Sequence, residues 1–521
     1  MGERGGFRAS TRVLARTVAW ALGLSTWLAL GAPSPLLPAS ASIGPVNLKV
    51  MTFNIGGDEW AGWNTRPGSP KTADPMADVE RVIRKSGADI VGVQEPFGRM
   101  LQLAHDLGPG WYASPRLYIL SKYPIIEPPG SDGVYGYVEI APGQVVGVAD
   151  VHLPSAPNGL ARLSRGQTKH QVLQVERRTR LRAIRPILAK IQPPMDAGTP
   201  FFFTGDFNST SWRDWTRRVV RARPEDRYPV KWPVSLAMER AGFHDAYRQL
   251  FPNAVRDPGF SWPANWLDHV YHPSHHTYRI DFIWDSGPIH PLSMANYGDA
   301  GSPWTDHVMR PWPSDHRALV GTFSVTPVVP PVLVSVPHTR VERGLRIPVT
   351  FHRSGPGDKV ELVPHGADLS APIQTRSAGP GDDGTVSFRT RHLALGAYDA
   401  VLVDGGSTDL GRVETWIVPR RSDPIISVSK TTIRQGHRIH VSWRNAAGNR
   451  YDWLGIYRPD VNPFTGGLWA WRYTHAKVNG NGWIGPSSHA YWPLGPGRWT
   501  VRWCIDDAYV CPAQATFRVV R

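Results

Sequence analysis

Six short segments between residues 46 and 326 each join an apolar run to a polar or ionisable residue. The residues at these junctions are Asn54, Glu95, His152, Asp206 with Asn208, Asp281, and Asp315 with His316. Apolar runs of this length are typical of buried strands, and helical spacing recurs between them at 78–85 and 171–191. Alternating strands and helices predict an α/β fold, in which polar groups at strand ends can meet.

Carboxylates, carboxamides and imidazoles at strand ends indicate a hard-cation site with proton-transfer groups beside it. Such oxygen-rich ligands suit Mg²⁺, or alternatively Mn²⁺ or Ca²⁺. A single segment of this kind would be compatible with an ordinary loop. The prediction therefore depends on all six occurring in this order.

With these motifs the sequence resembles the endonuclease/exonuclease/phosphatase superfamily, the DNase I-like group that includes nucleases, sphingomyelinases and inositol-polyphosphate phosphatases. The most specific motifs are Gly205-Asp206-Phe207-Asn208 and Ser314-Asp315-His316, and residues 120–125 resemble the family's Ser-Arg-Tyr-Pro strand. The resemblance covers residues 46–325. It implies a four-layer α/β sandwich in which two sheets pack against each other.

The resemblance also implies a metal-binding role for three residues. Glu95 matches the principal metal ligand, and Asn54 and Asp315 match residues close to the cation or its waters.

A catalytic role is implied for five more residues. Asp206 and Asn208 match the pair that orients the attacking water and a phosphate oxygen. His316 matches the histidine beside the scissile phosphate, Asp281 its carboxylate partner, and His152 the second phosphate-facing histidine. Imidazoles would neutralise the charge that grows in the transition state. The sequence does not distinguish Asp206 from His316 as the group that takes the proton of the water.

These features predict a secreted, divalent-metal-dependent phosphoester hydrolase, with phosphodiesterase activity as the first expectation. One alternative is a secreted nuclease acting on DNA or RNA. A second, of a different class, is a non-catalytic surface-binding protein on a hydrolase scaffold, although the complete motif set argues against it. The inositol-phosphatase pattern Trp-x-Gly-Asp-Leu-Asn is absent, since residues 203–208 read Phe-Thr-Gly-Asp-Phe-Asn.

Other polar and aromatic residues near these motifs are expected to have structural roles. The dipeptides at 268–269 and 306–307 repeat Asp-His but lead into no apolar strand. Asp58 lies near enough to Asn54 in the sequence to reach the metal, but it has no clear counterpart in the family. His275 and His276 are expected in surface loops, with substrate contact as the alternative. For the tryptophans near the motifs, lining of a substrate cleft and ordinary packing are equal alternatives; they are Trp60, Trp63, Trp262, Trp266, Trp304 and Trp312. Four arginines are expected on the exposed face of the 171–191 helix, with phosphate steering as the alternative: Arg177, Arg178, Arg180 and Arg182.

Three folded domains and an export signal are predicted. Residues 46–326 form the catalytic domain, and a Pro/Val-rich linker follows at 327–331. Residues 334–351 then match 426–443 at a constant offset of 92. Short alternating strands in each copy predict two immunoglobulin-like β-sandwiches, at 332–420 and 424–521.

The first 41 residues have the pattern of a cleaved signal peptide. Arg4, Arg8, Arg12 and Arg16 precede an apolar run at 18–30, and Ala39-Ser40-Ala41 offers a small-residue cleavage site. Cys504 and Cys511 are the two cysteines of the chain. In an exported protein, such a close pair predicts one disulfide.

Basic charge is concentrated in the last two-fifths of the chain, where residues 327–521 hold 23 basic against 15 acidic residues. This balance is compatible with charge that only keeps the domains solvated. The sharper prediction is that the sandwiches of a monomeric enzyme rest on an anionic surface and take no part in the chemistry. The alternative is that they cover an apolar face of the catalytic domain. Trp443, Trp499 and Trp503 are expected in a sandwich core, and Trp469 and Trp471 in exposed contacts.

Overall fold

The computed structural model describes the chain over residues 43–56, 74–264, 277–300, 302–337, 339–379, 381, 383–461, 467–486, 492–505 and 510–521. Several sequence predictions lie outside these residues: the signal peptide, Asp58, Trp60, Trp63, Trp266, the 268–269 dipeptide, His275 and His276. Among the described residues, no helix has the length and apolar character needed to cross a membrane.

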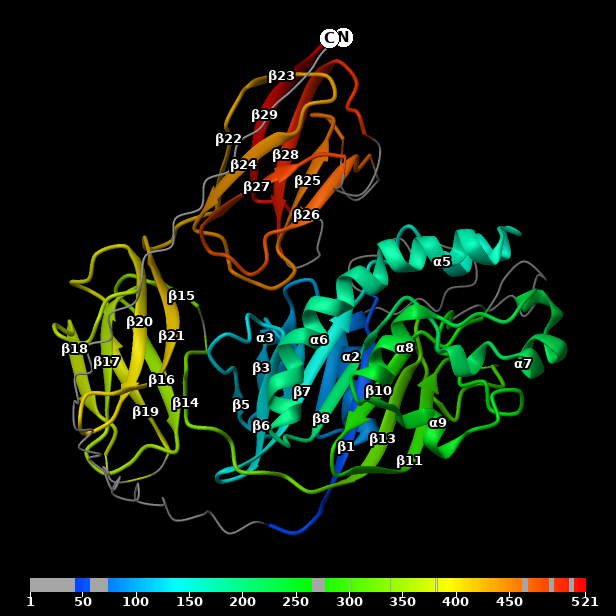
Figure 1. Cartoon of the computed structure of the whole chain (residues 1–521), viewed down its shortest axis with the longest axis horizontal. Helices are drawn as coiled ribbons and strands as arrows, with labels where there is room; N and C mark the ends of the chain where they lie inside the picture. Colours follow the sequence, from blue (N-terminus) through cyan, green and yellow to red (C-terminus); the bar gives the residue numbers. More distant parts are fainter. Residues whose placement is uncertain are drawn as a thin grey trace, which may run out of the picture. The chain divides into compact units, whose positions relative to one another are not determined.

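Two sheets form the centre of the first domain (Figure 1). The seven-stranded sheet has the order β12 (His307–Val308), β11 (Ile289–Gly298), β13 (Ala318–Val325), β1 (Val46–Asn54), β2 (Ile90–Gln94), β4 (Ile119–Ser121), β3 (Tyr112–Ser114). The six-stranded sheet has the order β5 (Ile125–Ile126), β6 (Tyr135–Ala141), β7 (Gln144–His152), β8 (Phe201–Asp206), β10 (Asp281–Ser286), β9 (His244–Asp245).

Strand β1 shows how the sequence produces the layers. Leu48 and Val50 point into the core between the two sheets, where they join strands of the six-stranded sheet. The side chains of Met51 and Phe53 point to the opposite face of the sheet, where they pack against α2 (Pro75–Ser86) and α3 (Met100–Leu107). Side chains alternate along a strand, so a strand that is apolar on both faces belongs in an interior layer.

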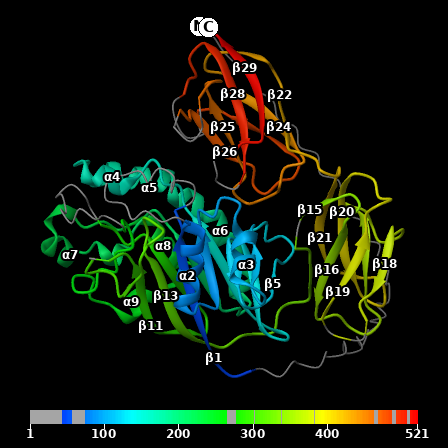
Figure 2. The ribbon, with the colours of Figure 1, turned by 180° about the vertical axis from the view of Figure 1, so that it is seen from behind.

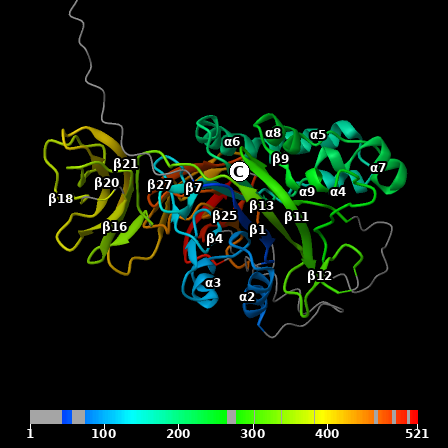
Figure 3. The same ribbon diagram turned by 90° about the horizontal axis from the view of Figure 1, so that it is seen from below.

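Helices cover the outer face of each sheet. Figure 2 shows α2 and α3 over the seven-stranded sheet. The six-stranded sheet packs against α6 (Arg180–Asp196) and α8 (Pro233–Arg240), and Figure 3 shows these helices on the side opposite α2 and α3. The remaining helices are α4 (Gly159–Ser164), α5 (Lys169–Arg178), α7 (Arg217–Ala222), α9 (Ala246–Leu250) and two 3₁₀ turns at Trp212–Asp214 and Pro224–Asp226. The predicted four-layer α/β sandwich is therefore confirmed.

The predicted helix at 171–191 consists of two helices, α5 and α6, which meet at Thr179. Thr168 begins α5 with a capping box to Gln171. Immediately after Thr179, the fully buried Arg180 forms a 3.1 Å ion pair with the equally buried Glu176. The expectation that Arg180 lies on an exposed face is therefore wrong, because its carboxylate partner allows the cation to be buried.

Residues 333–418 and 425–520 form two β-sandwiches with the same strand order. The first sandwich has a three-stranded sheet in the order β14 (Leu333–Ser335), β16 (Arg346–His352), β19 (Gly384–Arg389). Its five-stranded sheet has the order β15 (Arg340–Glu342), β21 (Asp409–Val418), β20 (Gly396–Val403), β17 (Lys359–Pro364), β18 (Gln374–Ser377). The second sandwich has a three-stranded sheet in the order β22 (Ile425–Val428), β24 (Ile439–Arg444), β27 (Gly480–Ile484). Its five-stranded sheet has the order β23 (Thr432–Arg434), β29 (Ala513–Val520), β28 (Gly497–Cys504), β25 (Trp453–Tyr457), β26 (Ala470–Tyr473). The all-β prediction is confirmed, and the immunoglobulin-like assignment stays a prediction.

The second sandwich places its tryptophans as follows. Trp443, Trp499 and Trp503 lie in its core. Trp469 and Trp471 are half-buried rather than exposed, because each packs edge-on against another tryptophan of the same sandwich. The predicted disulfide between Cys504 and Cys511 is present.

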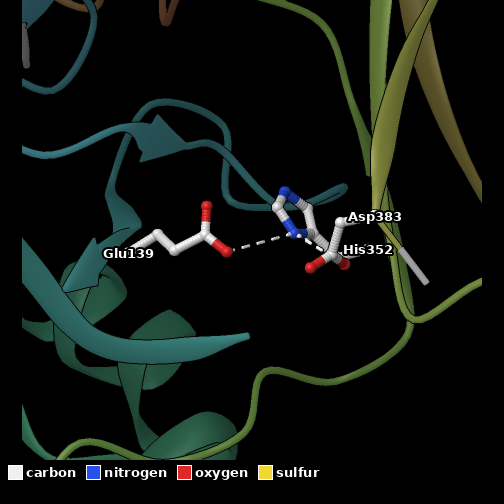
Figure 4. Close-up of side chains that lie close together, drawn as sticks. All are labelled: Glu139, His352 and Asp383. Atoms are coloured by element: carbon white, nitrogen blue, oxygen red, sulfur yellow. Dashed lines mark ion pairs between the residues drawn. The ribbon is translucent and has the colours of Figure 1, made fainter. Parts of the chain in front are cut away.

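The segment that follows the catalytic domain contacts the six-stranded sheet. Val328 exchanges two backbone hydrogen bonds with Val145 of β7, at 2.7 and 3.0 Å. Nearby, the His352 Nδ1 of the first sandwich lies 3.2 Å from Asp383 and 3.9 Å from Glu139 of β6 (Figure 4). The predicted linker is therefore anchored to β7, and β6 shares a charged contact with the first sandwich.

Candidate active site

Strand register brings the predicted site residues to one edge of the two sheets. In the seven-stranded sheet, Asn54 at the end of β1 pairs with the last residue of β2, directly before Glu95. In the six-stranded sheet, Asp206 pairs with His152 on one side and with Asp281 on the other. Three of the six predicted segments therefore lie side by side across β7, β8 and β10.

The Asn54 side chain connects the two sheets. Its Nδ2 donates to Glu95 Oε1 and to Asp206 Oδ2, both at 3.1 Å. Its Oδ1 accepts a hydrogen bond from the backbone N–H of Gly56 at 3.0 Å. The fully buried amide thus holds two carboxylates of the site close together.

His316 and Asp281 form the predicted imidazole–carboxylate pair. His316 Nδ1 lies 2.9 Å from Asp281 Oδ2, and both residues are buried. Burial acts to lower the pKa of His316, but Asp281, Asp315 and Asp206 together raise it well above its ordinary value. These carboxylates favour the imidazolium form of His316, in which both ring nitrogens carry a proton.

A second imidazole approaches the same carboxylate oxygen. His152 Nε2 lies 3.6 Å from both Glu95 Oε1 and Asp206 Oδ2. His316 Nε2 lies 3.7 Å from Asp206 Oδ2. The two histidines thus converge on one oxygen of Asp206 from different elements.

Asn208 fixes the orientation of Asp206. Its backbone N–H donates to Asp206 Oδ1 at 2.8 Å, and its Nδ2 donates to Asp206 Oδ2 at 3.2 Å and to the Leu153 carbonyl at 3.0 Å. Asn208 has φ 47° and Glu95 has φ 58°, both in the left-handed region. A non-glycine residue in that region is strained by about 1–3 kcal/mol, and such strain concentrates at functional sites.

The carboxylates of the site are destabilised as anions. Desolvation, followed by the nearby Asp315, raises the pKa of Glu95 to about 7. Desolvation, followed by the charge of Asp281, also raises the pKa of Asp206. A bound cation would relieve both effects, because an opposite charge favours the ionised carboxylate.

The oxygen donors fit a hard divalent cation. Glu95 and Asp315 supply carboxylates that influence each other electrostatically, and Asp315 Oδ2 is oriented by a 3.0 Å hydrogen bond from Trp262 Nε1. In this structure Asn54 presents its amide nitrogen, rather than its oxygen, to Glu95. Ligand atoms of Asp206, Asp281 and His316 also lie within 4.8 Å of one another, where the hydrogen bond between the imidazole and Asp281 accounts for the arrangement.

Two supporting residues were not among the sequence-predicted site residues. Ser314 Oγ donates to the Asn54 carbonyl at 2.7 Å and accepts from the backbone N–H of His316 at 3.0 Å. It therefore ties the His316 loop to β1. Its signal was present in the Ser314-Asp315-His316 motif. Asp150, the second, lies two residues before His152 as a charge inside an apolar run.

Asp150 lies between the sheets and is fully buried. Its Oδ1 accepts hydrogen bonds from Gln94 Nε2 at 2.7 Å and from Thr204 Oγ1 at 2.6 Å. Burial raises its pKa well above the ordinary value, which favours the neutral acid. A Cβ at Gly92 would lie 2.0 Å from Thr204 Oγ1, so only glycine allows this close approach of the sheets.

Four other residues that the sequence analysis singled out have structural contacts in the described part of the chain. Trp312 is buried against Phe53, and Trp304 packs edge-on against Phe260. Asp306 accepts a hydrogen bond from a backbone N–H, and its neighbour His307 stacks on a tyrosine.

A loop of the second sandwich contacts β7 beside the site. Arg450 Nη1 donates to the Asp150 carbonyl at 2.8 Å, and the backbone N–H of His152 donates to Tyr451 Oη at 3.3 Å. The Tyr451 ring stacks on Tyr118, with centroids 4.7 Å apart and planes 14° apart. The second sandwich therefore contacts the strand that carries His152, through contacts that span about three hundred residues of sequence. The expectation that the sandwiches take no part in the chemistry stays a prediction.

Comparisons with known proteins support the first domain. The model of the Endonuclease/Exonuclease/phosphatase family matches residues 51–316. An uncharacterized protein of Caenorhabditis elegans is 25% identical over 307 residues, covering 53% of this chain and 91% of that protein. The crystal structure of an endonuclease/exonuclease/phosphatase from Beutenbergia cavernae is 15% identical over 71% of this chain and 99% of that chain, with a TM-score of 0.33. A mannosyl-6-phosphatase from Bacteroides thetaiotaomicron is 14% identical over 53% and 99%, with a TM-score of 0.28.

Proposed function

Because the chain belongs to the endonuclease/exonuclease/phosphatase family, whose members are phosphoester hydrolases, we propose that it is a divalent-metal-dependent phosphoester hydrolase. The observation that carries this proposal is the convergence of two imidazoles, His152 and His316, on Asp206 Oδ2 beside Glu95. Positive donors next to buried carboxylates suit a reaction in which phosphate oxygens gain negative charge.

His316 is the main stabiliser of that charge. Asp281 holds Nδ1, so that Nε2–H points away from the pair toward the space beside Asp206. The raised pKa of His316 favours a protonated Nε2, which suits a hydrogen-bond donor to a phosphate oxygen better than a base. His152 Nε2 reaches the same region from β7.

Asp206 is the better candidate for the base. Its pKa is raised by desolvation, which makes it a stronger proton acceptor than an exposed carboxylate. Asn208 holds it in one orientation. A water oxygen attacks phosphorus while Asp206 takes its proton, the bond from phosphorus to the leaving oxygen breaks, and solvent protonates the leaving group.

Glu95 and Asp315 would hold the cation, with Asn54 beside it. When bound, Mg²⁺ or a similar ion would withdraw negative charge from the phosphate oxygens. The donor set supports this assignment because Glu95 and Asp315 both offer carboxylate oxygens. The raised pKa of Glu95 indicates a carboxylate that lacks sufficient positive charge nearby.

We further propose that the protein acts outside the cytoplasm. Four arginines, an apolar run and a small-residue site within residues 1–41 support export and cleavage. Expression with the full leader, followed by N-terminal sequencing of the protein from the medium, would test this. A mature protein that retains residue 1 would contradict cleavage.

A metal-titrated assay tests the hydrolase. Chelated protein should be inactive on bis(p-nitrophenyl) phosphate or p-nitrophenyl phosphate and should regain turnover with Mg²⁺ or Mn²⁺. Turnover of the diester would support the expected phosphodiesterase activity. Glu95→Gln should abolish the regain, whereas Glu225→Gln, an exposed carboxylate outside the site, should not. A folded, metal-binding protein without turnover of any phosphoester would favour the non-catalytic alternative.

A further inference from the structure

A cavity of about 1110 Å³ adjoins the candidate active site at His152. The catalytic domain lines it with the end of β7 and with one face of α5 and α6. The first sandwich contributes residues of β21, and the second contributes Arg450, Tyr451 and the residues from β26 to Asn479. Ligand pockets in proteins are typically about 300–1,000 Å³, so this cavity is large enough for a small molecule.

The lining of the cavity has an excess of unpaired positive charge. Among the described residues, five of its basic side chains have no carboxylate within 4.0 Å: Arg178, Arg182, Arg450, Arg472 and Lys477. Three further basic residues of the lining form ion pairs with carboxylates. Arg178 at the end of α5 and Arg182 in the first turn of α6 both line the cavity, from either side of the break at Thr179.

Arg472 shows that this charge is only partly solvated. Its guanidinium is about half-buried, and among the residues that the structure describes it donates only to the backbone carbonyls of Tyr473 and Trp483. Burial lowers its pKa, and no carboxylate offsets that effect. A partly buried cation without a counter-charge is costly, and an anionic ligand would supply the missing partner.

The pKa of His475 shows that the electrostatic potential at this wall of the cavity is positive. Burial lowers its pKa, and the positive charges of Arg472 and Lys477 lower it further. The second sandwich therefore presents a positive surface to the cavity independently of the arginines on α5 and α6. Because the cavity is confined between three domains, its geometry favours a small polyanion over a nucleic-acid duplex or a membrane surface.

We propose that this cavity binds the part of the substrate beyond the scissile phosphate, and that this part carries a second phosphate group. The inference rests on the proposed function and adds the substrate class: a small phosphoester with at least one further phosphate. Arg178, Arg182 and Lys477 are then specificity residues supplied by two domains. The arginine fork suits phosphate oxygens, and lysine supplies a point charge.

A binding experiment on the metal-free full chain tests the cavity separately from catalysis. In EDTA, tripolyphosphate measured by calorimetry should bind one site per chain, at least tenfold more tightly than orthophosphate. The double variant Arg178→Gln/Arg182→Gln should weaken tripolyphosphate binding about tenfold or more. The matched control Arg177→Gln/Arg185→Gln removes the same charge from exposed positions of α5 and α6 outside the cavity, and should leave binding within twofold.

A second pair of variants tests the part of the cavity that the second sandwich contributes. Lys477→Gln should weaken tripolyphosphate binding severalfold, whereas Lys430→Gln, an exposed lysine of the same sandwich outside the cavity, should have no effect. Absence of tripolyphosphate binding, or equal losses in the cavity and control variants, would overturn the proposal.

A turnover experiment connects the cavity to the substrate. With Mg²⁺, kcat/KM for glucose 1,6-bisphosphate should exceed that for glucose 6-phosphate at least tenfold, and Arg178→Gln/Arg182→Gln should remove most of that preference through KM. The control Arg177→Gln/Arg185→Gln, outside the cavity, should keep both the preference for the bisphosphate and the wild-type rate on p-nitrophenyl phosphate. A wild-type enzyme that turns over p-nitrophenyl phosphate without preferring the bisphosphate would refute the inference and leave the hydrolase standing. Tripolyphosphate binding without turnover of any phosphoester would instead count against the proposed function alone.

Discussion

The backbone N–H of His152 donates a hydrogen bond to the hydroxyl of Tyr451, so the second sandwich touches the strand that carries an active-site histidine. Tyr451 is itself part of the core cluster that contains β1, α2 and α3. The contact is therefore more than a surface encounter between neighbouring domains, because an aromatic ring of one domain completes the packing of another.

We expect Tyr451→Ala to lower both stability and turnover. Losing a buried aromatic ring leaves a cavity that typically costs about 3–5 kcal/mol, and a small displacement of His152 can reduce kcat/KM by roughly tenfold to a hundredfold. Tyr451→Phe should retain the stacking on Tyr118 and most of the activity. Thermal unfolding and steady-state kinetics would measure both effects. Wild-type kinetics in Tyr451→Ala would show that the loop does not position His152.

His316→Ala and Asp281→Asn should both lower kcat, with the larger loss for the histidine. Proton-transfer and charge-stabilising groups of this kind typically contribute about 10²–10⁴-fold. Asp281 acts through the imidazole, so the double variant should lose much less than the product of the single losses. A double-variant cycle at saturating Mg²⁺ would measure this. Fully multiplicative losses would contradict the pairing.

Metal affinity should rise with pH through about 7. The pKa of Glu95 is raised to about 7, so below that pH the cation must displace a proton from its principal ligand. The dissociation constant for Mn²⁺ should therefore increase by up to about tenfold for each pH unit below 7 and become constant above pH 7. Calorimetry between pH 6 and 8 would test this, and Glu95→Gln should remove both the affinity and its pH dependence.

Asp150→Asn should make stability less sensitive to pH. The pKa of Asp150 is raised in the folded protein, so the folded state keeps a proton that the unfolded state loses above about pH 4. Wild-type stability relative to the variant should then fall by up to about 1.4 kcal/mol per pH unit from pH 4 until the folded pKa is passed. Urea unfolding of both proteins at pH 5 and pH 7 would give the difference. A difference that does not change with pH would mean that Asp150 is ionised when folded.

Much of the first domain is predictable because its signals are local. Apolar runs ending at Asn54, Glu95 and Asp206 mark interior strands, and the motif residues at their ends are brought together by register alone. The break between α5 and α6 was not predictable from spacing, since apolar periodicity continues through Thr179 while Arg180 turns inward to Glu176.

Contacts between distant domains were also beyond sequence reasoning. Arg450 and Tyr451 lie in a polar loop with no local feature that points to β7. The arginine-rich sequence of α5 and α6 likewise gave no indication that Arg178 and Arg182 share a cavity with Lys477. Such relations depend on how three folded domains meet, which no periodicity records.

The position of β1 in the seven-stranded sheet has a consequence for how the domain folds. Val46 pairs with Val325, so an interior strand made at the start of the domain needs a partner made at its end. Pairings across such a sequence distance give a high contact order and slow folding, because the intervening loop must close before any contact forms. A nascent chain that has not reached β13 presents β1 with an open, apolar edge, which is a site for aggregation. The seven-stranded sheet can therefore be completed only after residue 325 has been synthesised.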